Sequence, residues 1–429
     1  MENSVKNLIQ FIDHSPSCFH VIENAKKQFL EHGFIQLEEK EHWNLEEGKS
    51  YFVERNGSSM IAFHLPKKDF QGFHIVASHS DSPTYRIKEQ PEMSVEKHYT
   101  KLNIERYGGM IPETWFDRPL SVAGRIIIEE NGQIKDQLVN IDRDLMIIPN
   151  LAIHMSRSSN ESKQLNPQKD LLPLCGGNLT KDGFEEMIAK ESGVEKEDIL
   201  SYDLFLYNRM RGTTLGINEE FVAAPKLDDL ECVYSSIEGM LNAKLSKDYV
   251  TVCAVFDNEE VGSGTKQGAG STFFPEVLKR ISYLCGKNEE EYYMAVADSF
   301  MLSADNAHAV HPNYQDKTDP TNRPYINEGI VLKYNASQKY TTDANSAALV
   351  KYLCKKEKIK CQVFFNRSDM LGGSTLGNIL TGQVSIKAAD IGLPQLSMHS
   401  TYETAGCKDL DDMITLMGSF YELGKEVQI

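Results

Sequence analysis

The chain has 429 residues, of which 41% are hydrophobic and 25% charged, a composition typical of a globular protein. Its length exceeds the roughly 250–300 residues at which a single hydrophobic core stops growing, which excludes one small binding module and favours two lobes or an inserted domain. The 62 acidic residues outnumber the 45 basic ones, giving a net charge of −17, and a surface of this sign repels phosphate backbones and anionic lipids. We therefore expect neither a nucleic acid nor a membrane as a partner.

Targeting signals and cysteine spacing point to the same compartment. The sequence has no run of about 18 apolar residues and no basic segment leading into an apolar core near residue 1, so we predict neither a membrane span nor a signal peptide. The eight cysteines are scattered without any C-x-x-C spacing, which argues against a zinc ribbon or a dense disulfide framework. We expect free thiols and a cytoplasmic protein.

The pattern of predicted helices and strands changes near residue 88. Apolar residues recur on one face of a helix predicted over 15–33, and short apolar segments then predict strands at 59–65 and 72–78. Beyond residue 88 we expect strand-like pieces separated by polar loops, at 124–129, 137–141 and 203–207. This pattern predicts an inserted, mostly β domain over residues 89–224.

Helices and strands alternate in the second half of the chain. We predict helices over 229–241, 273–285, 345–356 and 409–424. The strands predicted between them are 250–256, 292–297, 361–365 and 383–388. Such alternation favours an α/β fold, a three-layer sheet with flanking helices, made by residues 1–88 and 225–429 and split around the insert.

Polar residues follow the predicted strands, where open α/β sheets bind their ligands. His79 comes directly after one strand and is able to ligate a metal, while Asp81 is placed to accept the other ring N–H and fix the tautomer. Glu259 and Glu260 come after the strand predicted at 250–256, so that one carboxylate is available for a metal and its neighbour for general-base catalysis. A charged surface loop is the alternative interpretation of the two glutamates.

Three more residues with metal-binding side chains lie at comparable positions in the α/β lobe. Asp228 stands where the insert returns to the α/β lobe, Asp305 lies beyond the strand predicted to end at residue 297, and His399 follows the last sheet segment. Asp298 is even closer to that strand, and the spacing does not choose between it and Asp305. Nitrogen and oxygen ligands without thiolates suit a hydrolytic site with two metal ions.

Several long motifs, in the same order along the chain, resemble those of the aspartyl aminopeptidases, metallopeptidase family eighteen, in its bacterial branch. The resemblance runs nearly end to end. It rests on Ser78-His-Ser-Asp-Ser-Pro83, Thr114-Trp-Phe-Asp-Arg118 with Ala123-Gly-Arg125, Leu151-Ala-Ile-His154, Phe256-Asp-Asn-Glu-Glu-Val-Gly-Ser263, Ser303-Ala-Asp305 with Ala307-His-Ala-Val-His-Pro-Asn-Tyr314, and Met398-His-Ser400.

This resemblance implies a di-zinc aminopeptidase, with manganese or cobalt as other possible ions, acting on peptides with free N-termini. It assigns Glu259 as general base and Asp81 as the residue that orients His79, and it selects Asp305 over Asp298. The implied metal ligands are His79, Glu260, Asp305 and His399, with Asp228 bridging the two ions. His154 matches a family histidine that is either a further zinc ligand or a contact to a neighbouring subunit's substrate.

The resemblance also bears on substrate and assembly. Lys333 stands where the family carries a lysine suited to an acidic N-terminal side chain, and His308 and Asp369 match family positions near the substrate. The family forms tetrahedral shells of twelve subunits through the inserted domain, which implies a homododecamer and a dimerisation role for the insert. This chain departs from the family at Asp229, where asparagine is usual, and at Asn306, where methionine is usual.

Two alternatives stay open. One is a co-catalytic metallohydrolase that prefers neutral N-termini or non-peptide amides. The other is a catalytically silent assembly protein, against which the intact Glu259 and the complete ligand set argue.

Overall fold

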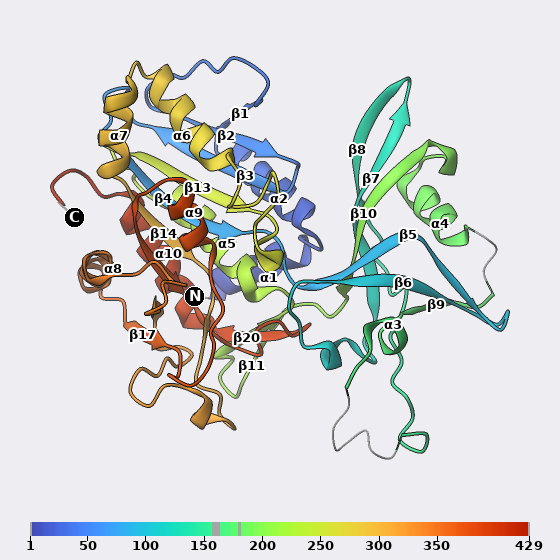
Figure 1. Ribbon diagram of the computed structural model, residues 1–429. Helices are drawn as coiled ribbons and strands as arrows, with labels where there is room; N and C mark the ends of the chain where they lie inside the picture. Colours follow the sequence, from blue (N-terminus) through green and yellow to red (C-terminus); the bar gives the residue numbers. More distant parts are fainter. Residues whose placement is uncertain (1, 157–163, 179–181, 428–429) are drawn as a thin grey trace.

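A nine-stranded sheet forms the centre of the larger of two bodies in the computed structural model (Figure 1). The structure describes residues 2–156, 164–178 and 182–427. Every residue of the two central strands β13 and β4 is buried, because helices cover both of their faces. In spatial order the strands are β1 (Ile35–Leu37), β2 (Lys49–Arg55), β3 (Ser59–Leu65), β13 (Val250–Phe256), β4 (Phe73–His79), β14 (Phe300–Ala304), β18 (Lys387–Gly392), β16 (Ile330–Tyr334) and β17 (Cys361–Phe365).

The helices of this body make two outer layers, each with its own apolar core against the sheet. One layer consists of α1 (Glu2–Asp13), α2 (Cys18–Glu31), α5 (Leu227–Asn242), α8 (Ala344–Glu357) and α10 (Cys407–Tyr421). The opposite layer consists of α6 (Phe273–Leu284), α7 (Glu289–Ala297) and α9 (Leu376–Gln383). The predicted three-layer α/β architecture is therefore confirmed.

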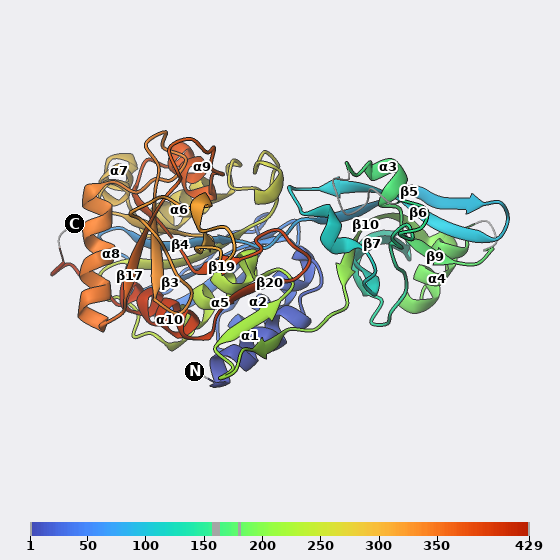
Figure 2. The same cartoon turned by 90° about the horizontal axis from the view of Figure 1, so that it is seen from below.

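The smaller body is built on a six-stranded sheet with a separate apolar core and lies to one side of the larger body (Figure 2). Its two short helices are α3 (Pro167–Asp170) and α4 (Gly183–Ser192). In spatial order its strands are β8 (Gln133–Asn140), β7 (Leu120–Glu130), β10 (Ile199–Asn208), β5 (Thr84–Val95), β6 (Tyr99–Tyr107) and β9 (Leu174–Gly176). No helix in the described part of the chain is long and apolar enough to cross a bilayer.

The strands of this smaller sheet span residues 84–208, whereas the sequence predicted an insert over 89–224. The difference at the end arises from β11 (Thr213–Leu215) and β12 (Phe221–Ala224), which join a five-stranded sheet with β20 (Glu403–Gly406), β19 (Pro394–Leu396) and β15 (Ala307–His308). Short strands separated by turns look alike in sequence whichever sheet they join, so the pattern does not locate this boundary.

Two predicted strands of the second half are wrong. Residues 292–297 belong to helix α7, which begins with a capping box between Asn288 and Glu291, and the strand is β14 further along the chain. Residue 383 ends helix α9, and the strand predicted at 383–388 is β18, which starts at Lys387. A short apolar run does not distinguish helix from strand by its periodicity.

Four neighbouring strands bring the predicted site residues to one edge of the large sheet. Strands β13, β4, β14 and β18 are parallel, and the last residue of β13, Phe256, is in register with His79 at the end of β4. Because the carboxyl ends of parallel strands meet at the same edge, the segment after β13 and Asp305 after β14 converge on His79.

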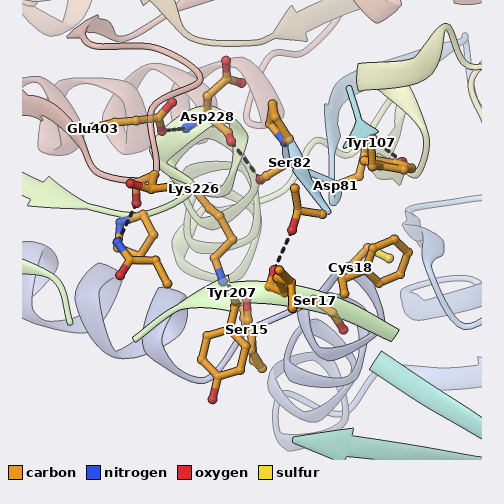
Figure 3. Close-up of a pocket in the computed structure, with 18 of the residues that line it drawn as sticks. Ser15, Ser17, Cys18, Asp81, Ser82, Tyr107, Tyr207, Lys226, Asp228 and Glu403 are labelled. Carbon is orange, nitrogen blue, oxygen red and sulfur yellow. Dashed lines mark hydrogen bonds between the residues drawn. The ribbon is translucent and has the colours of Figure 1, made fainter. Parts of the chain in front are cut away.

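An open cavity of about 690 Å³, a volume that includes the solvent at its mouth, lies between the two bodies (Figure 3). The turn between α1 and α2 lines it, as do Tyr107 and Tyr207 of the smaller body and Lys226 of the larger body. Asp81 and Asp228 also line it, so this cavity lies directly behind the edge of the sheet where the site residues converge.

Candidate active site

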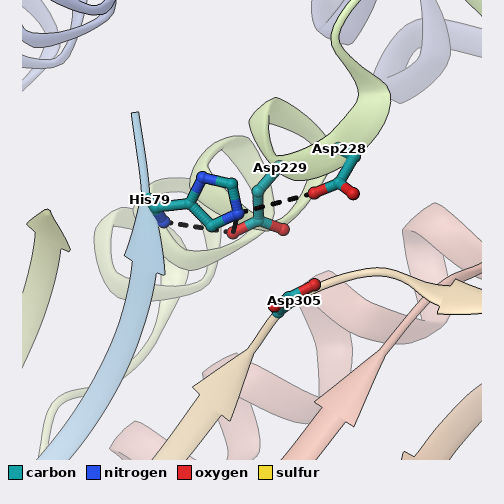
Figure 4. Close-up of side chains that lie close together, drawn as sticks. All are labelled: His79, Asp228, Asp229 and Asp305. Carbon is teal, nitrogen blue, oxygen red and sulfur yellow. Dashed lines mark hydrogen bonds and ion pairs between the residues drawn. The ribbon is translucent and has the colours of Figure 1, made fainter. Parts of the chain in front are cut away.

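Four buried side chains form one candidate metal group at the end of β4 (Figure 4). His79, Asp228, Asp229 and Asp305 each offer one ligand atom, and these atoms all lie within 4.8 Å of one another. The Nε2 atom of His79 is 3.5 Å from Oδ1 of Asp228 and 4.0 Å from Oδ2 of Asp229.

A second candidate group shares one member with the first. Asp228, Glu260 and His399 also place their ligand atoms within 4.8 Å of one another. The Nε2 atom of His399 is 3.4 Å from Oδ2 of Asp228 and 3.4 Å from Oε1 of Glu260. Asp228 thus belongs to both candidate groups and turns one oxygen toward His79 and the other toward His399.

The residues fit divalent cations such as zinc. Two atoms bound at about 2.0–2.1 Å to one tetrahedral zinc ion are about 3.4 Å apart, which matches the separations of 3.4 and 3.5 Å between each histidine and Asp228. Among the described residues, buried oxygens of Asp228, Asp229 and Glu260 have no hydrogen-bond partner. A buried carboxylate oxygen without a donor is costly unless a cation binds it.

Like charges dominate the electrostatics of the two groups. Burial and the neighbouring carboxylates raise the pKa of Glu260 and of Asp229 well above the usual range. Burial also acts to raise the pKa of Asp228, but its contacts with His399 and His79 outweigh that effect and lower it. Without a cation, Glu260 and Asp229 therefore favour the protonated form, and a bound cation would favour their charged form instead.

Asp81 contacts the ring of His79 on the side away from the candidate metal group. The Nδ1 atom of His79 lies 3.1 Å from the backbone oxygen of Asp81 and 3.4 Å from its Oδ1. Asp81 also accepts two backbone N–H bonds, from Glu259 at 3.1 Å and from Glu260 at 3.2 Å. These contacts leave Nε2 of His79 facing the other ligand atoms, as a metal-binding histidine requires.

Glu259 lines the same cavity as the two groups and is half-buried. Burial raises its pKa to about 8, the carboxylates of Asp305, Asp81 and Asp228 act in the same direction, and His79 opposes them. A carboxyl group with a pKa near the working pH is able both to take up and to release a proton.

The active-site cavity measures about 780 Å³ with its open mouth, and Lys333 contributes a cation to its wall. Lys333 is only 2% exposed, and its Nζ donates to the backbone oxygens of Asp305 at 2.7 Å and of Asn306 at 3.2 Å. His308 lines the cavity as well, with its ring 6.0 Å from that of Phe364.

Two predicted site residues lie apart from this cluster. Asp369 is exposed and pairs with Arg367, whose Nε is 2.7 Å from its Oδ1, and it is not among the described residues that line the cavity. His154 is exposed in the smaller body, between β8 and α3, and belongs to neither candidate metal group of the described residues. Within one chain, the structure does not place His154 with the other candidate ligands.

Glu403 is a site residue that the sequence did not reveal. One of its carboxylate oxygens accepts the backbone N–H of His399 at 2.6 Å, and the other accepts that of Asp228 at 3.0 Å. Its side chain is 2% exposed and ties together two candidate ligands from distant parts of the chain. No pattern of spacing marks Glu403, because the contact depends on where β20 lies in the fold.

A family model described as "Aminopeptidase I zinc metalloprotease (M18)" matches residues 11–421. The chain belongs to the M18 family of zinc aminopeptidases. It is therefore a metalloexopeptidase, and the predicted family is confirmed.

Relatives and solved structures agree with the family model along the whole chain. "Probable M18 family aminopeptidase 2" of Clostridium acetobutylicum is 46% identical over 97% of this chain and 98% of its own. A chain in a cryo-EM structure of the Ape4 and Nbr1 complex is 36% identical, with a TM-score of 0.95 over 98% of this chain and 85% of its own. The Saccharomyces mApe1 dodecamer is 26% identical, with a TM-score of 0.85 over 98% of this chain and 97% of its own.

Proposed function

We propose that this M18 aminopeptidase holds two zinc ions and removes acidic N-terminal residues from peptides with free N-termini. The observation that carries the two-ion proposal is the shared carboxylate. Asp228 faces His79 with one oxygen and His399 with the other. One ion would be held by His79, Asp305 and Asp228, and the other by Glu260, His399 and Asp228.

Two zinc ions held in this way would lower the pKa of a shared water molecule and polarise the carbonyl of the scissile bond. Glu259 is assigned as the general base that takes the proton from the attacking water and delivers it to the leaving amine. Asp81 keeps the His79 ring in the orientation that turns Nε2 toward the cavity. Manganese or cobalt would fit the same nitrogen and oxygen ligands.

The preference for acidic residues rests on Lys333. It is a buried cation in the wall of the active-site cavity, and a carboxylate side chain in the cavity would gain a charge-assisted contact there. His308 is a second side chain that faces this space, and Asp369 is assigned a place near the substrate by its motif alone.

Preference for neutral N-termini is the second candidate, and one observation favours it. Two of the three Nζ protons of Lys333 already bond to backbone oxygens of residues 305 and 306, and the ammonium group is 3.5 Å from Oδ1 of Asp305. A substrate carboxylate would have to share this donor.

We also propose a tetrahedral homododecamer assembled through the smaller body. The loop that carries His154 supports this, because Leu151, Ile153 and Met155 are 51%, 46% and 77% exposed. An apolar loop of this kind is suited to burial against another subunit, where His154 would reach a neighbour's substrate. The eight cysteines are free, which supports a place in the reducing cytoplasm.

The Glu259→Gln variant tests the assignment of zinc aminopeptidase chemistry. We expect it to retain the zinc content of the parent protein and to lose nearly all turnover, because it keeps the candidate ligands and removes the base. Zinc content is measured by elemental analysis, and turnover with a free peptide and its acetylated form. The parent should cleave only the free peptide. Full turnover by Glu259→Gln, or cleavage of the acetylated peptide, would contradict the proposal.

A further inference from the structure

Tyr107, at the end of β6 in the smaller body, reaches into the candidate active site of the larger body. Its hydroxyl donates to Oδ2 of Asp81 at 2.7 Å and accepts a hydrogen bond from Nδ2 of Asn258, also at 2.7 Å. Tyr107 thus links the inserted sheet to the hydrogen-bond network around Glu259.

The partners of Asn258 fix the direction of these two bonds. Its amide oxygen accepts from the hydroxyl of Thr265 at 2.7 Å and from Nε2 of Gln267 at 2.8 Å, so its Nδ2 is the atom that faces Tyr107. Because Asn258 donates to the phenol oxygen, the phenol proton is directed to Asp81. Burial, with nearby Asp81 and Asp257, raises the pKa of Tyr107, which keeps this proton in place.

Asp81 connects Tyr107 to Glu259 and Glu260 by hydrogen bonds. Its Oδ2, which accepts from Tyr107, also accepts the backbone N–H of Glu260, and its Oδ1 accepts that of Glu259. The backbone positions of Glu259, the candidate base, and Glu260, a candidate ligand, therefore depend on the Asp81 carboxylate. The hydrogen bond from Tyr107 restricts the rotation of that carboxylate.

The residues that follow Tyr107 continue along the same site. Gly108 has a φ of +77° and passes so close to Glu260 that a Cβ would lie 3.1 Å from the Glu260 Cβ. The backbone N–H of Ile111 donates to the backbone oxygen of His399 at 3.0 Å. The segment 107–111 of the smaller body thus contacts two residues of the candidate metal groups, Glu260 and His399.

We propose that Tyr107 is a positioning residue for the peptidase reaction: through Asp81 it holds Glu259 and Glu260 in place, which makes the inserted body part of the catalytic machinery. The inference rests on the proposed function, in which Glu259 is the base. It assigns to the insert a role at the reaction centre that is separate from any role in assembly.

The test is Tyr107→Phe, which removes one oxygen atom and keeps the ring that packs edge-on against Phe205. At saturating zinc we expect kcat to fall about 10- to 100-fold, as for other residues that orient metal-site groups, with KM and zinc content unchanged. Tyr202→Phe is the matched control, since its buried hydroxyl donates to the backbone oxygen of Lys88 far along the same sheet. The control should keep the parent kcat.

A second measurement separates positioning from a general loss of packing. In an Asp81→Asn background, Tyr107→Phe should cost much less than it does in the parent, because the group through which it acts is already altered. Three results would each overturn the inference while the parent remains active: an unchanged kcat in Tyr107→Phe, an equal loss of kcat in Tyr202→Phe, or additive losses when Tyr107→Phe is combined with Asp81→Asn. A parent protein without peptidase activity would overturn the proposed function and this inference together.

Discussion

Lys333 is the residue on which the proposed substrate preference depends, and its two backbone bonds make it both a candidate specificity residue and a support for Asp305. We expect Lys333→Met to lower the ratio of kcat/KM for an N-terminal Asp substrate to that for a Leu substrate by about 10- to 100-fold, the value of one hydrogen bond to a charged group. Both substrates are assayed on the same preparation.

The ratio cancels any damage to the metal centre, because loss of support for Asp305 slows both substrates alike. Lys333→Arg is the companion variant and should keep a preference for Asp by retaining the charge. An Asp to Leu ratio that is the same in the parent and in Lys333→Met would favour the preference for neutral N-termini.

Several site residues were predictable because they directly follow strands. His79, Glu259 and Glu260 lie at the ends of β4 and β13, both of which the sequence placed closely. The choice between Asp298 and Asp305 was not predictable from spacing, because the preceding strand was misplaced. Asp298 in fact lies at the C-terminal end of α7 and accepts the hydroxyl of Tyr249 at 3.0 Å, whereas Asp305 directly follows β14.

Glu403 and Tyr107 were missed for a different reason. Each acts through hydrogen bonds to residues far away in sequence, such as Asp228 for Glu403 and Asp81 for Tyr107. Local patterns report which residues share a face or follow a strand, but such long-range contacts exist only once the sheets and the two bodies are in place.

At the level of elements, strand β4 carries a titratable group in the core. His74 is 2% exposed, is stacked on Tyr249 at 4.0 Å, and has a pKa that burial lowers to about 3. In the unfolded chain the pKa of His74 is about 6.5, whereas in the folded chain it is about 3. Between pH 6.5 and pH 3 the unfolded state therefore binds more protons, and the free energy of unfolding falls as the pH falls. At pH 5 the free energy of unfolding is lower by about 2 kcal/mol than at a pH where His74 is neutral in both states.

We expect His74→Phe to remove this part of the acid sensitivity, so that the free energy of unfolding falls less between pH 6.5 and 5 than in the parent. Denaturant unfolding at several pH values measures the difference. The exposed His42 provides a control, since His42→Gln should follow the parent curve. Parallel curves for His74→Phe and the parent would show that His74 does not contribute.

Apolar periodicity predicted the helices α2, α5, α6, α8 and α10 and the two central strands β4 and β13. The misassigned helix α7 shows where the pattern fails. Its apolar run at 292–297 has the composition of a short buried strand, and the stronger signal was the capping box at Asn288 and Glu291 that precedes it. Local start signals therefore carry information that a short hydrophobic run lacks.

At the scale of the whole molecule, the apolar loop at 151–155 and the proposed shell predict a large particle. We expect light scattering to give a mass near twelve times that of the 48.4 kDa chain. Ile153→Asp, which places a charge in this loop, should lower that mass, because a buried unpaired charge opposes association. A single species of 48.4 kDa from the parent protein would rule out the assembly.

Because Asp228 faces both histidines, we expect the thermal stability of the protein to depend on the concentration of the metal that binds there. A ligand that binds the folded chain alone stabilises it by thermodynamic linkage, here by relieving repulsion among buried carboxylates. Chelation should therefore lower the Tm of the parent and of Glu259→Gln, and added zinc should restore it, whereas Asp228→Asn should respond much less. An equal response of all three in calorimetry would contradict this. In a cell short of zinc, such a protein would be lost by unfolding and proteolysis as well as by inactivity, so that its abundance would follow the metal.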